Sequence, residues 1–211
     1  MAGQVLSHIP LALDELPVLP EISQKVLALI DDPDSSMDDL ADLIRDDTVM
    51  SAKVLNVSNS ALYGGLTQIT DLSNACARLG IRTVATIVQT IANENLYKPE
   101  DLAAQELMKT LWHHTVATAY LSNEIAVLLS SPNPSIYYLA GLVHDIGKIV
   151  LVDIIYSEKE GPLSELKDKP ELIHEIISNY HGLVGLHIVQ TWNLPPEFAV
   201  AAYCHHIPDI C

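Results

Sequence analysis

Apolar residues recur along most of the chain at the three- and four-residue spacing that places them on one side of a helix. The stretch EISQKVLALI follows Pro20, which suits the start of a helix, and it carries Ile22 and Val26 at this spacing. Ser36, three residues before Asp39, resembles the beginning of a capping box. The two-residue alternation that is typical of strands hardly appears. The pattern therefore predicts an all-α fold.

Polar residues and glycines predict where the next helices begin and end. Thr48 is expected to cap a short helix, TVMSAKVLNVS. Thr70 or Asp71 should begin the helix in DLSNACARL, and Gly80 should end it. The remaining helices are expected over residues 81–96, 101–130, 136–156, 171–178 and 181–192, and from Pro195 or Pro196 to residue 206.

Two polar stretches interrupt the helical pattern. Residues 56–65, NVSNSALYGG, are expected to form a turn held by hydrogen bonds from side chains to the backbone. The second stretch, Tyr97-Lys98-Pro99, is typical of a boundary. We therefore expect a helical subdomain over residues 1–99 and a helical bundle over residues 100–211.

Composition narrows the class of protein. Of the 211 residues, 49% are apolar and 18% are charged, which excludes a disordered chain. No apolar run approaches the roughly 18 residues of a membrane span, and the N-terminus lacks the basic region of a secretory signal. The three cysteines, an odd number, indicate reduced thiols. We expect a cytoplasmic protein that does not contact a membrane.

The charge balance argues against one class of partner. The formal net charge is −16, and eight aspartates lie between residues 31 and 47 with only Arg45 to offset them. Because affinity for nucleic acid comes largely from cations that neutralise phosphates, direct binding of nucleic acid is not expected. The acidic run is interpreted as a solvated face that keeps the protein soluble.

Eight of the nine histidines follow residue 110, and they mark the candidate chemistry. The most informative stretch is GLVHDIGKIVL, in which His144, Asp145 and Lys148 interrupt a run of aliphatic residues. Neighbouring residues on a helix point about 100° apart, so His144 and Asp145 can share one ion only with ligands from other helices. His114, His181 and either His205 or His206 can supply them. Imidazole and carboxylate ligands suit zinc, manganese or iron.

A purely structural role for these histidines is the alternative to a metal site. A single histidine on an apolar helix is usually a core residue with satisfied hydrogen bonds. Asp145 is the sharpest feature, because a buried carboxylate without a partner costs several kcal/mol. Its partner is either a metal ion or Lys148, which lies on the same helical face three residues later.

At these residues the sequence resembles a known family. His144-Asp145 in GLVHDIGK resembles the metal-binding motif of the HD phosphohydrolase superfamily. Nearly the whole chain resembles the HDOD domain, a bacterial signalling relative of that superfamily. The matching segments are LPVLPEI, SAKVLNVSNSALYG, ARLGIRTV, LWHHT, GLVHDIGK, HGLVGLHIVQTWNLP and the histidine pair at 205 and 206. The resemblance implies an N-terminal helical subdomain packed on an HD-like helical bundle, which together form one HDOD domain.

The resemblance also implies roles for individual residues. Lys148 would lie near a substrate phosphate and, with Asp145, would be catalytic if the protein is an enzyme. The divalent metal ion would be iron, manganese, zinc, nickel or magnesium. The implied metal ligands are His114, His144, Asp145, His181, His205 and His206.

The sequence departs from active relatives at three points. Thr110 stands where the cyclic-di-GMP-hydrolysing relatives place a metal-bridging glutamate. The residues after His206 read IPDIC without the GYP signature, and the later helix that supplies a last aspartate ligand does not follow. Asp209 is too close to His206 to be assumed to replace that ligand.

Three functions are therefore left in competition. The first is a regulatory signal-transduction domain, non-catalytic or weakly catalytic, that acts through protein partners. The second is a metal-dependent phosphohydrolase acting on a nucleotide or cyclic dinucleotide. The third is a structural site in which a metal ion or a His–Asp–Lys network only stabilises the bundle.

Overall fold

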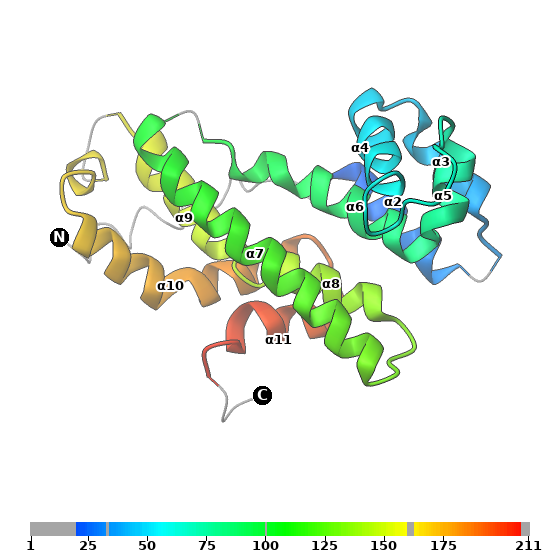
Figure 1. Cartoon of the computed structure of the whole chain (residues 1–211). Coiled ribbons are helices and arrows are strands. Elements are labelled where there is room, and N and C mark those ends of the chain that lie inside the picture. The colour runs from blue at the N-terminus through cyan, green and yellow to red at the C-terminus, as the bar shows by residue number, and fades with distance from the viewer. Residues whose placement is uncertain (1–19, 33, 100, 160–162, 208–211) are drawn as a thin grey trace. The chain divides into compact units, whose positions relative to one another are not determined.

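The chain, seen here in a computed structural model, is described over residues 20–32, 34–99, 101–159 and 163–207, and its elements there are all helical (Figure 1). The predicted all-α fold is confirmed. The described residues form two compact units, one up to residue 93 and one from residue 94 onward. The predicted functional division into residues 1–99 and 100–211 stays a prediction.

The N-terminal unit is a small helical cluster. It comprises α2 (Glu21–Asp31), α3 (Met37–Arg45), α4 (Thr48–Ser58), α5 (Leu72–Leu79) and most of α6 (Ile81–Glu94). Its core is aliphatic and includes Val26, Leu40, Ile44, Val54 and Val88, all almost fully buried. The apolar spacing along each helix thus supplies the buried face that its neighbours cover.

Short polar side chains fix the helix ends in this unit. Ser36 and Asp39 form the predicted capping box at the start of α3. The prediction that Thr48 caps α4 is wrong, because the Asp47 carboxylate accepts hydrogen bonds from the backbone of residues 49 and 50 and makes Thr48 the first helical residue. Asp71 begins α5 and Gly80 ends it with a φ of 80°, which a glycine adopts without steric cost.

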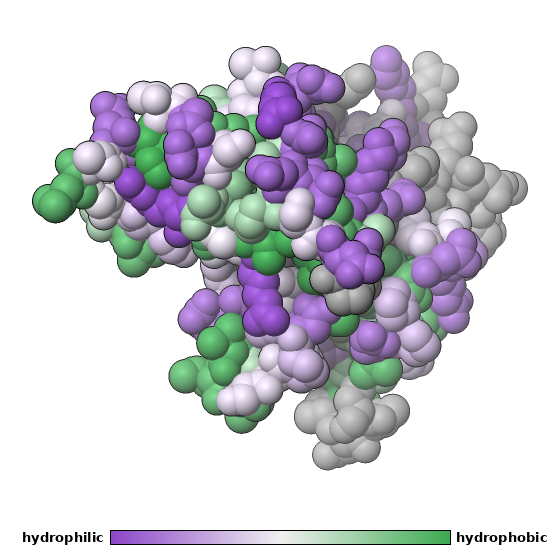
Figure 2. Space-filling view, turned by 90° about the vertical axis from the view of Figure 1, so that its right-hand side faces the viewer, coloured by the Kyte–Doolittle hydropathy of each residue, from purple (hydrophilic) through white to green (hydrophobic). Residues whose placement is uncertain are grey.

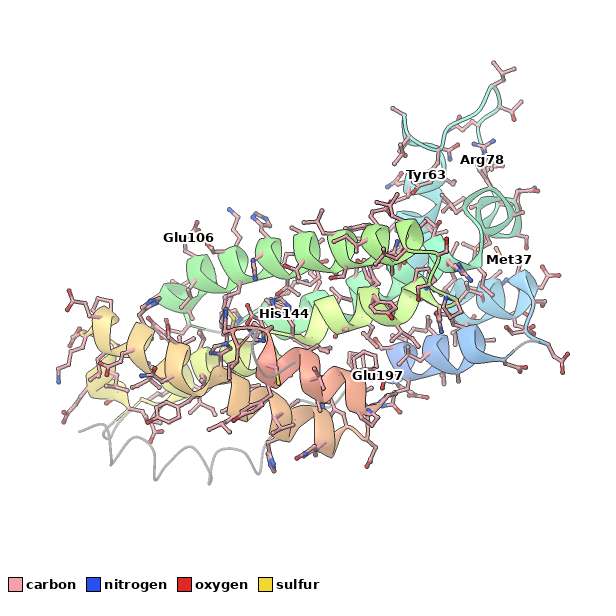
Figure 3. The ribbon with its side chains drawn as sticks, turned by 90° about the horizontal axis from the view of Figure 1, so that it is seen from below. Met37, Tyr63, Arg78, Glu106, His144 and Glu197 are labelled. Atoms are coloured by element: carbon pink, nitrogen blue, oxygen red, sulfur yellow. The ribbon has the colours of Figure 1, made fainter. Side chains whose placement is uncertain are left out.

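The loop between α4 and α5 is held as predicted by side-chain-to-backbone hydrogen bonds. The Asn59 amide donates to the carbonyls of Leu55 and Ile69 and accepts from the Ile69 N–H, over 2.8 to 3.0 Å. Arg78 donates to the carbonyls of residues 58 and 67. The loop, which carries Tyr63 (Figure 3), is therefore held near both of its ends by these hydrogen bonds.

The C-terminal unit is a bundle whose helices close a ring. It contains η2 (Asn95–Tyr97), α7 (Leu102–Leu128), α8 (Pro134–Val143), α9 (Ile146–Ser157), η3 (Ser164–Leu166), α10 (Pro170–Thr191) and α11 (Pro196–Cys204). Around the ring, α7 packs on α8, α8 on α11, α11 on α10, α10 on α9, and α9 on α7. Helices far apart in sequence thereby surround one interior.

Two glycines allow very close contacts between helices in this bundle. A Cβ atom on Gly141 of α8 would lie 2.5 Å from the Ala119 Cα of α7. One on Gly147 of α9 would lie 2.0 Å from the His181 carbonyl oxygen of α10. Side chains at these points would push the helices apart, so the glycines set how closely the segment around residues 144 and 145 approaches its neighbours.

Two predicted helix boundaries in this unit are wrong. Residues 136–156 form two helices, because the backbone at Asp145 (φ −103°, ψ 14°) leaves the α region. Residues 171–178 and 181–192 belong to one helix, α10, since the apolar positions Ile173, Ile177, Val184 and Ile188 continue through the polar residues between them. In both places packing against other helices outweighs local propensity.

The surface of the protein is mixed. No helix within the described ranges joins the length and the apolar character that crossing a bilayer requires. Hydrophilic and apolar side chains are interspersed over the face that Figure 2 shows. Among the described residues, the thiols of Cys76 and Cys204 are free.

The contact at Gly147 generates a prediction about stability. Gly147→Ala should lower the free energy of unfolding by about 2 kcal/mol or more, because its Cβ meets backbone atoms of α10 that cannot move aside. Urea denaturation followed by circular dichroism measures the change. Gly65→Ala is the control, since its Cβ meets nothing closer than 3.4 Å. Equal stability of the two variants would contradict the close helix contact.

Candidate metal centre

The structure brings the predicted site residues together inside the C-terminal unit. His114 lies in the middle of α7, and His144, labelled in Figure 3, forms the junction of α8 and α9 together with Asp145. His181 lies in α10, and His205 follows the last residue of α11. Two groups of ligand atoms, each within 4.8 Å of one another, result: Asp145 with His181, His205 and His206, and Asp145 with His114 and His144.

The Asp145 carboxylate is the member common to both groups. Its side chain is 1% exposed, and its two oxygens face different imidazoles. Oδ2 lies 3.4 Å from His114 Nε2 and 3.3 Å from His144 Nε2. Oδ1 lies 3.2 Å from His205 Nε2 and 3.9 Å from His181 Nε2. One carboxylate thus connects two pairs of histidines that come from four helical segments.

Backbone carbonyls fix the orientation of three of the imidazole rings. His144 Nδ1 lies 2.8 Å from the carbonyl oxygen of residue 141. His181 Nδ1 lies 2.8 Å from that of residue 177, and His205 Nδ1 lies 2.9 Å from that of residue 201. Because a carbonyl oxygen only accepts, each Nδ1 carries the proton and donates it. In the neutral rings, Nε2 is then an unprotonated atom that points to the centre.

These orientations leave acceptor atoms facing one another. The Nε2 atoms of His181 and His205 are 3.3 Å apart, and neither has a proton to share while both rings are neutral. Asp145 Oδ1, also close to His205, is buried and has no hydrogen-bond donor among the described residues. Three acceptors around one point are unfavourable unless a cation lies between them.

The spacing of these atoms fits a small divalent ion. Two ligand atoms bound at 2.0–2.1 Å to a tetrahedral ion lie about 3.3 Å apart. The distance between the Nε2 atoms of His181 and His205 is 3.3 Å, and that between the Nε2 atoms of His114 and His144 is 3.1 Å. The donor set, neutral imidazole and carboxylate, is also one that such ions prefer.

The electrostatics keep the ligand atoms in the form that binds a metal ion. Burial is the main cause that lowers the pKa of His114, His181 and His206, so these rings are neutral near pH 7. Burial alone would raise the pKa of Asp145, but His144 and His205, whenever their Nε2 atoms carry a proton, and the hydrogen bond from Lys148 outweigh burial and hold that pKa well below its usual range. The carboxylate is therefore ionised.

Only one of these contacts is a hydrogen bond from a permanent cation. Lys148 Nζ donates to Asp145 Oδ2 over 2.8 Å. The contacts of Asp145 with His144 and His205 become attractive only when a proton or another cation lies between ring and carboxylate, since the Nδ1 protons are already used. Lys148 donates a hydrogen bond to Oδ2 and leaves Oδ1 without a donor. Lys148 alone therefore does not compensate for the burial of both carboxylate oxygens.

Other residues singled out from the sequence lie apart from this centre. Thr110 is exposed, and its hydroxyl donates to the carbonyl of residue 106 in its own helix. His113, next to His114, is exposed and belongs to neither ligand group. Asp209 lies outside the described residues.

Several features of the site were not predicted. The sequence predicts residues 144 and 145 as neighbours within one helix, whereas the helix break lets Asp145 contact both histidine groups. The apolar pocket beside Lys148, whose walls include Leu107, Leu111 and Ile173, is not indicated by the sequence pattern. The apolar lining residues look like ordinary core positions in the sequence. Only His174, a polar lining residue on α10, could have indicated the pocket.

Comparison with known proteins gives the same architecture. The model of the HDOD domain family matches residues 16–208. An HDOD domain protein of unknown function from Geobacter sulfurreducens is 25% identical, with a TM-score of 0.75 over 99% of this chain and 70% of that one. A protein provisionally called a metal-dependent phosphohydrolase, from Shewanella amazonensis SB2B, is 24% identical, with a TM-score of 0.69 over 100% of this chain and 77% of that one.

Two further relatives extend the comparison. A provisional signal transduction protein from Marinobacter aquaeolei VT8 is 20% identical, with a TM-score of 0.66 over 99% of this chain and 51% of that one. A protein of uncharacterised function from Treponema pallidum (strain Nichols) is 26% identical over 208 residues. The match covers 93% of this chain but only 39% of that relative's length. The likenesses to solved structures below 25% identity show a shared fold.

The geometry predicts which histidines hold metal. His114→Ala should lower the metal content of protein purified without a histidine tag, because one of the two ligand groups loses a nitrogen. His113→Ala, one residue away and exposed, should leave the content unchanged. Elemental mass spectrometry of both variants and the wild type gives the measurement. An equal loss in both variants, or a loss in neither, would count against the assigned group.

Proposed function

This chain belongs to the HDOD domain family, and we propose that it is a regulatory signal-transduction domain whose C-terminal unit holds a divalent metal centre. The observation that carries the proposal is the buried Asp145 carboxylate, whose Oδ1 has no hydrogen-bond donor while unprotonated imidazole nitrogens face it. A purely structural His–Asp–Lys network would pair both carboxylate oxygens, and Lys148 pairs only Oδ2.

Two groups of side chains would each bind one metal ion. His181, His205 and His206 would share one ion with Asp145 Oδ1, and His114 and His144 would share another with Oδ2. The backbone carbonyls behind the rings would keep each Nε2 directed inward. Bound divalent ions would neutralise the acceptors that otherwise repel one another.

Such a centre suits regulation because its ligands come from different helical segments. Bound metal would link α7, the α8–α9 junction, α10 and the end of α11 through their ligand side chains. Loss of metal would remove these links. A ligand that binds only the folded state stabilises it in proportion to its saturation. Protein partners that contact these helices would then distinguish the loaded from the unloaded unit, which is how we relate the centre to signalling.

Support for the signalling role also comes from the family. The Marinobacter relative carries the name of a signal transduction protein, and family membership covers residues 16–208, including the N-terminal unit that has no ligand group among its described residues. A catalytic centre alone would not account for that unit. Direct nucleic-acid binding is no part of the proposal, given the net charge of −16.

Removing the shared ligand tests the centre. Asp145→Asn should abolish near-stoichiometric metal binding, and with it the stabilisation of about 2.7 kcal/mol expected at an ion concentration of 100 times Kd. Elemental analysis and thermal unfolding with manganese or zinc give the two readouts. Asp153→Asn, an exposed change on the same helix, is the control. Metal binding that survives in Asp145→Asn would sink the proposal.

A second candidate, a metal-dependent phosphohydrolase, is favoured by a separate observation. An open pocket of about 530 Å³ adjoins the centre and is lined by Lys148, His181 and His206. Bound divalent ions lower the pKa of water and polarise phosphoryl oxygens. Lys148 would hold the substrate phosphate, and Asp145 would fix the ammonium group of Lys148 in place. A nucleotide or a cyclic dinucleotide is the substrate class to examine.

Turnover assays separate the two candidates. If the second holds, protein loaded with manganese, iron or magnesium hydrolyses a compound from a nucleotide and cyclic-dinucleotide panel, and Lys148→Met lowers kcat/KM on the order of a hundredfold. Lys25→Met, which changes an exposed lysine of α2 that lines neither pocket, should have no such effect. Absence of turnover from metal-loaded protein rejects the phosphohydrolase and leaves the regulatory domain.

A further inference from the structure

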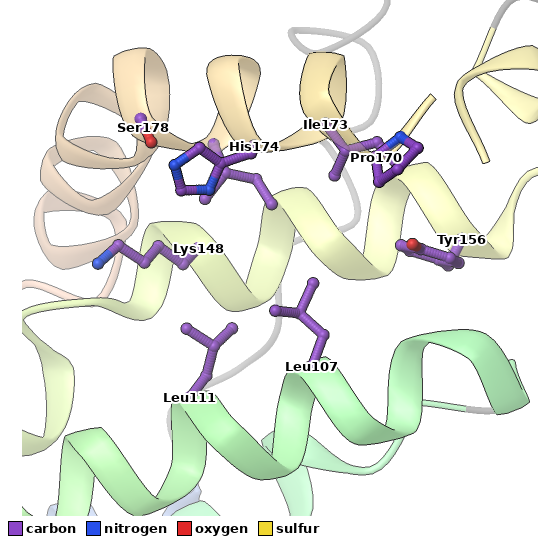
Figure 4. A pocket seen from close by; sticks show the side chains of 9 residues that line it. Leu107, Leu111, Lys148, Tyr156, Pro170, Ile173, His174 and Ser178 are labelled. Atoms are coloured by element: carbon purple, nitrogen blue, oxygen red, sulfur yellow. The ribbon is translucent and has the colours of Figure 1, made fainter. Parts of the chain in front are cut away.

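Lys148 also lines a second pocket, which is apolar. It has a volume of about 420 Å³ and lies between α7, α9 and α10 (Figure 4). Its walls are aliphatic: Leu107 and Leu111 project from α7, and Ile173 and Ile177 belong to α10. Pockets of this size and apolar character typically hold small organic molecules.

The pocket has a polar end and an aromatic end. Lys148 and Tyr156 mark them, both on α9 and eight residues apart (Figure 4). At 1.5 Å per residue this separation is about 12 Å. Lys167 Nζ donates to the Tyr156 carbonyl over 2.7 Å and lies 5.9 Å from the centre of the Tyr156 ring, which fixes the aromatic end.

The charges around the pocket select an anion. Among the described residues that line it there is no aspartate or glutamate, although the chain carries a net charge of −16. Lys148 Nζ uses one of its three protons on Asp145 and keeps two donors for a ligand. Its side chain is 19% exposed, so a charge bound there is only weakly screened by solvent.

The apolar and polar pockets meet at one place. Lys148 and Ser178 line both of them, and the polar pocket continues to His181 and His206 of the candidate metal centre. A molecule with its anionic group at Lys148 can therefore place an apolar group toward Tyr156 while the anion borders the metal ligands.

From this arrangement we propose that the apolar pocket binds the organic group of a phosphate ester whose phosphate contacts Lys148. That the ligand carries an apolar group and a negative charge is inferred from the lining of the pocket. That the negative group is a phosphate rests on the proposed metal centre. An aromatic group, or a short aliphatic chain of similar length, fits the distance from Lys148 to Tyr156. The pocket thus determines which phosphate esters the domain recognises.

Calorimetry with stable analogues tests the proposal. 1-Naphthylmethylphosphonate should bind metal-loaded full-length protein at least about tenfold more tightly than methylphosphonate, because burying the naphthyl group removes apolar surface from water. The carbon–phosphorus bond keeps both probes intact during the titration. 1-Naphthylmethylamine, which has the same apolar group and the opposite charge, should not bind measurably. Equal affinity for the two phosphonates, or tight binding of the amine, overturns the proposal.

Variants locate the binding. Leu107→Trp should fill the pocket and remove the advantage of the naphthyl probe without changing the affinity for methylphosphonate. Leu121→Trp is the matched control, on the same helix but at a side chain that is 64% exposed. Should Leu107→Trp fail to fold, His174→Asp provides the second test. His174 is an exposed lining residue, and a carboxylate there should weaken both phosphonates several-fold. No change in His174→Asp contradicts the assigned site.

The same titrations separate this inference from the proposed function. If elemental analysis finds no metal, but the naphthyl advantage exists and disappears in Leu107→Trp, the metal centre is rejected and the pocket stands. If metal is bound and the naphthyl probe has no advantage, the pocket is rejected and the metal centre stands. If another segment of the chain occupies the apolar pocket, the naphthyl probe will not bind there. That result also rejects the proposal that the pocket binds a phosphate ester.

Discussion

The burial of one carboxylate is the constraint on which the C-terminal unit depends. Asp145 is 1% exposed, and an ionised group in such a place needs opposite charge or hydrogen bonds. Lys148 supplies one hydrogen bond to Oδ2, and imidazoles from α7, α10 and the end of α11 surround the rest of the group. The ring of helices, the break between α8 and α9, and the glycine contacts all bring side chains to this point.

The glycines and the histidines act together there. Gly147 lets α9 approach the backbone of α10 at His181, and Gly141 lets α8 approach α7 near residue 119. Tyr97, buried below α7, donates a hydrogen bond to Thr115, the residue after His114. Close helix packing therefore positions the rings, and the carbonyls that accept their Nδ1 protons then orient them. Fold and site are set by the same contacts.

The candidate metal centre and the adjoining apolar pocket together would connect the two proposed functions. A regulatory domain needs a ligand or ion whose binding differs between two states, and a phosphohydrolase needs a place for the organic group of its substrate. Lys148 lies between the centre and the pocket, with one donor on Asp145 and two left over. If both proposals hold, an HDOD domain with this arrangement would have a physical means to bind a small phosphorylated molecule, with or without hydrolysing it.

The sequence alone determined the helical fold, the capping box at Ser36 and most of the histidines that meet around Asp145. The first two follow from local periodicity and from short polar side chains at helix ends. The rarity of ionisable groups in apolar runs pointed to His144 and Asp145, whereas the complete set with both His205 and His206 came only from the resemblance to the HD superfamily. The tertiary structure decided the break at residues 144 and 145, the continuity of α10, the sharing of Asp145 between two histidine groups and the pocket beside Lys148. These depend on contacts between helices distant in sequence, and such contacts leave no periodic pattern in any one helix.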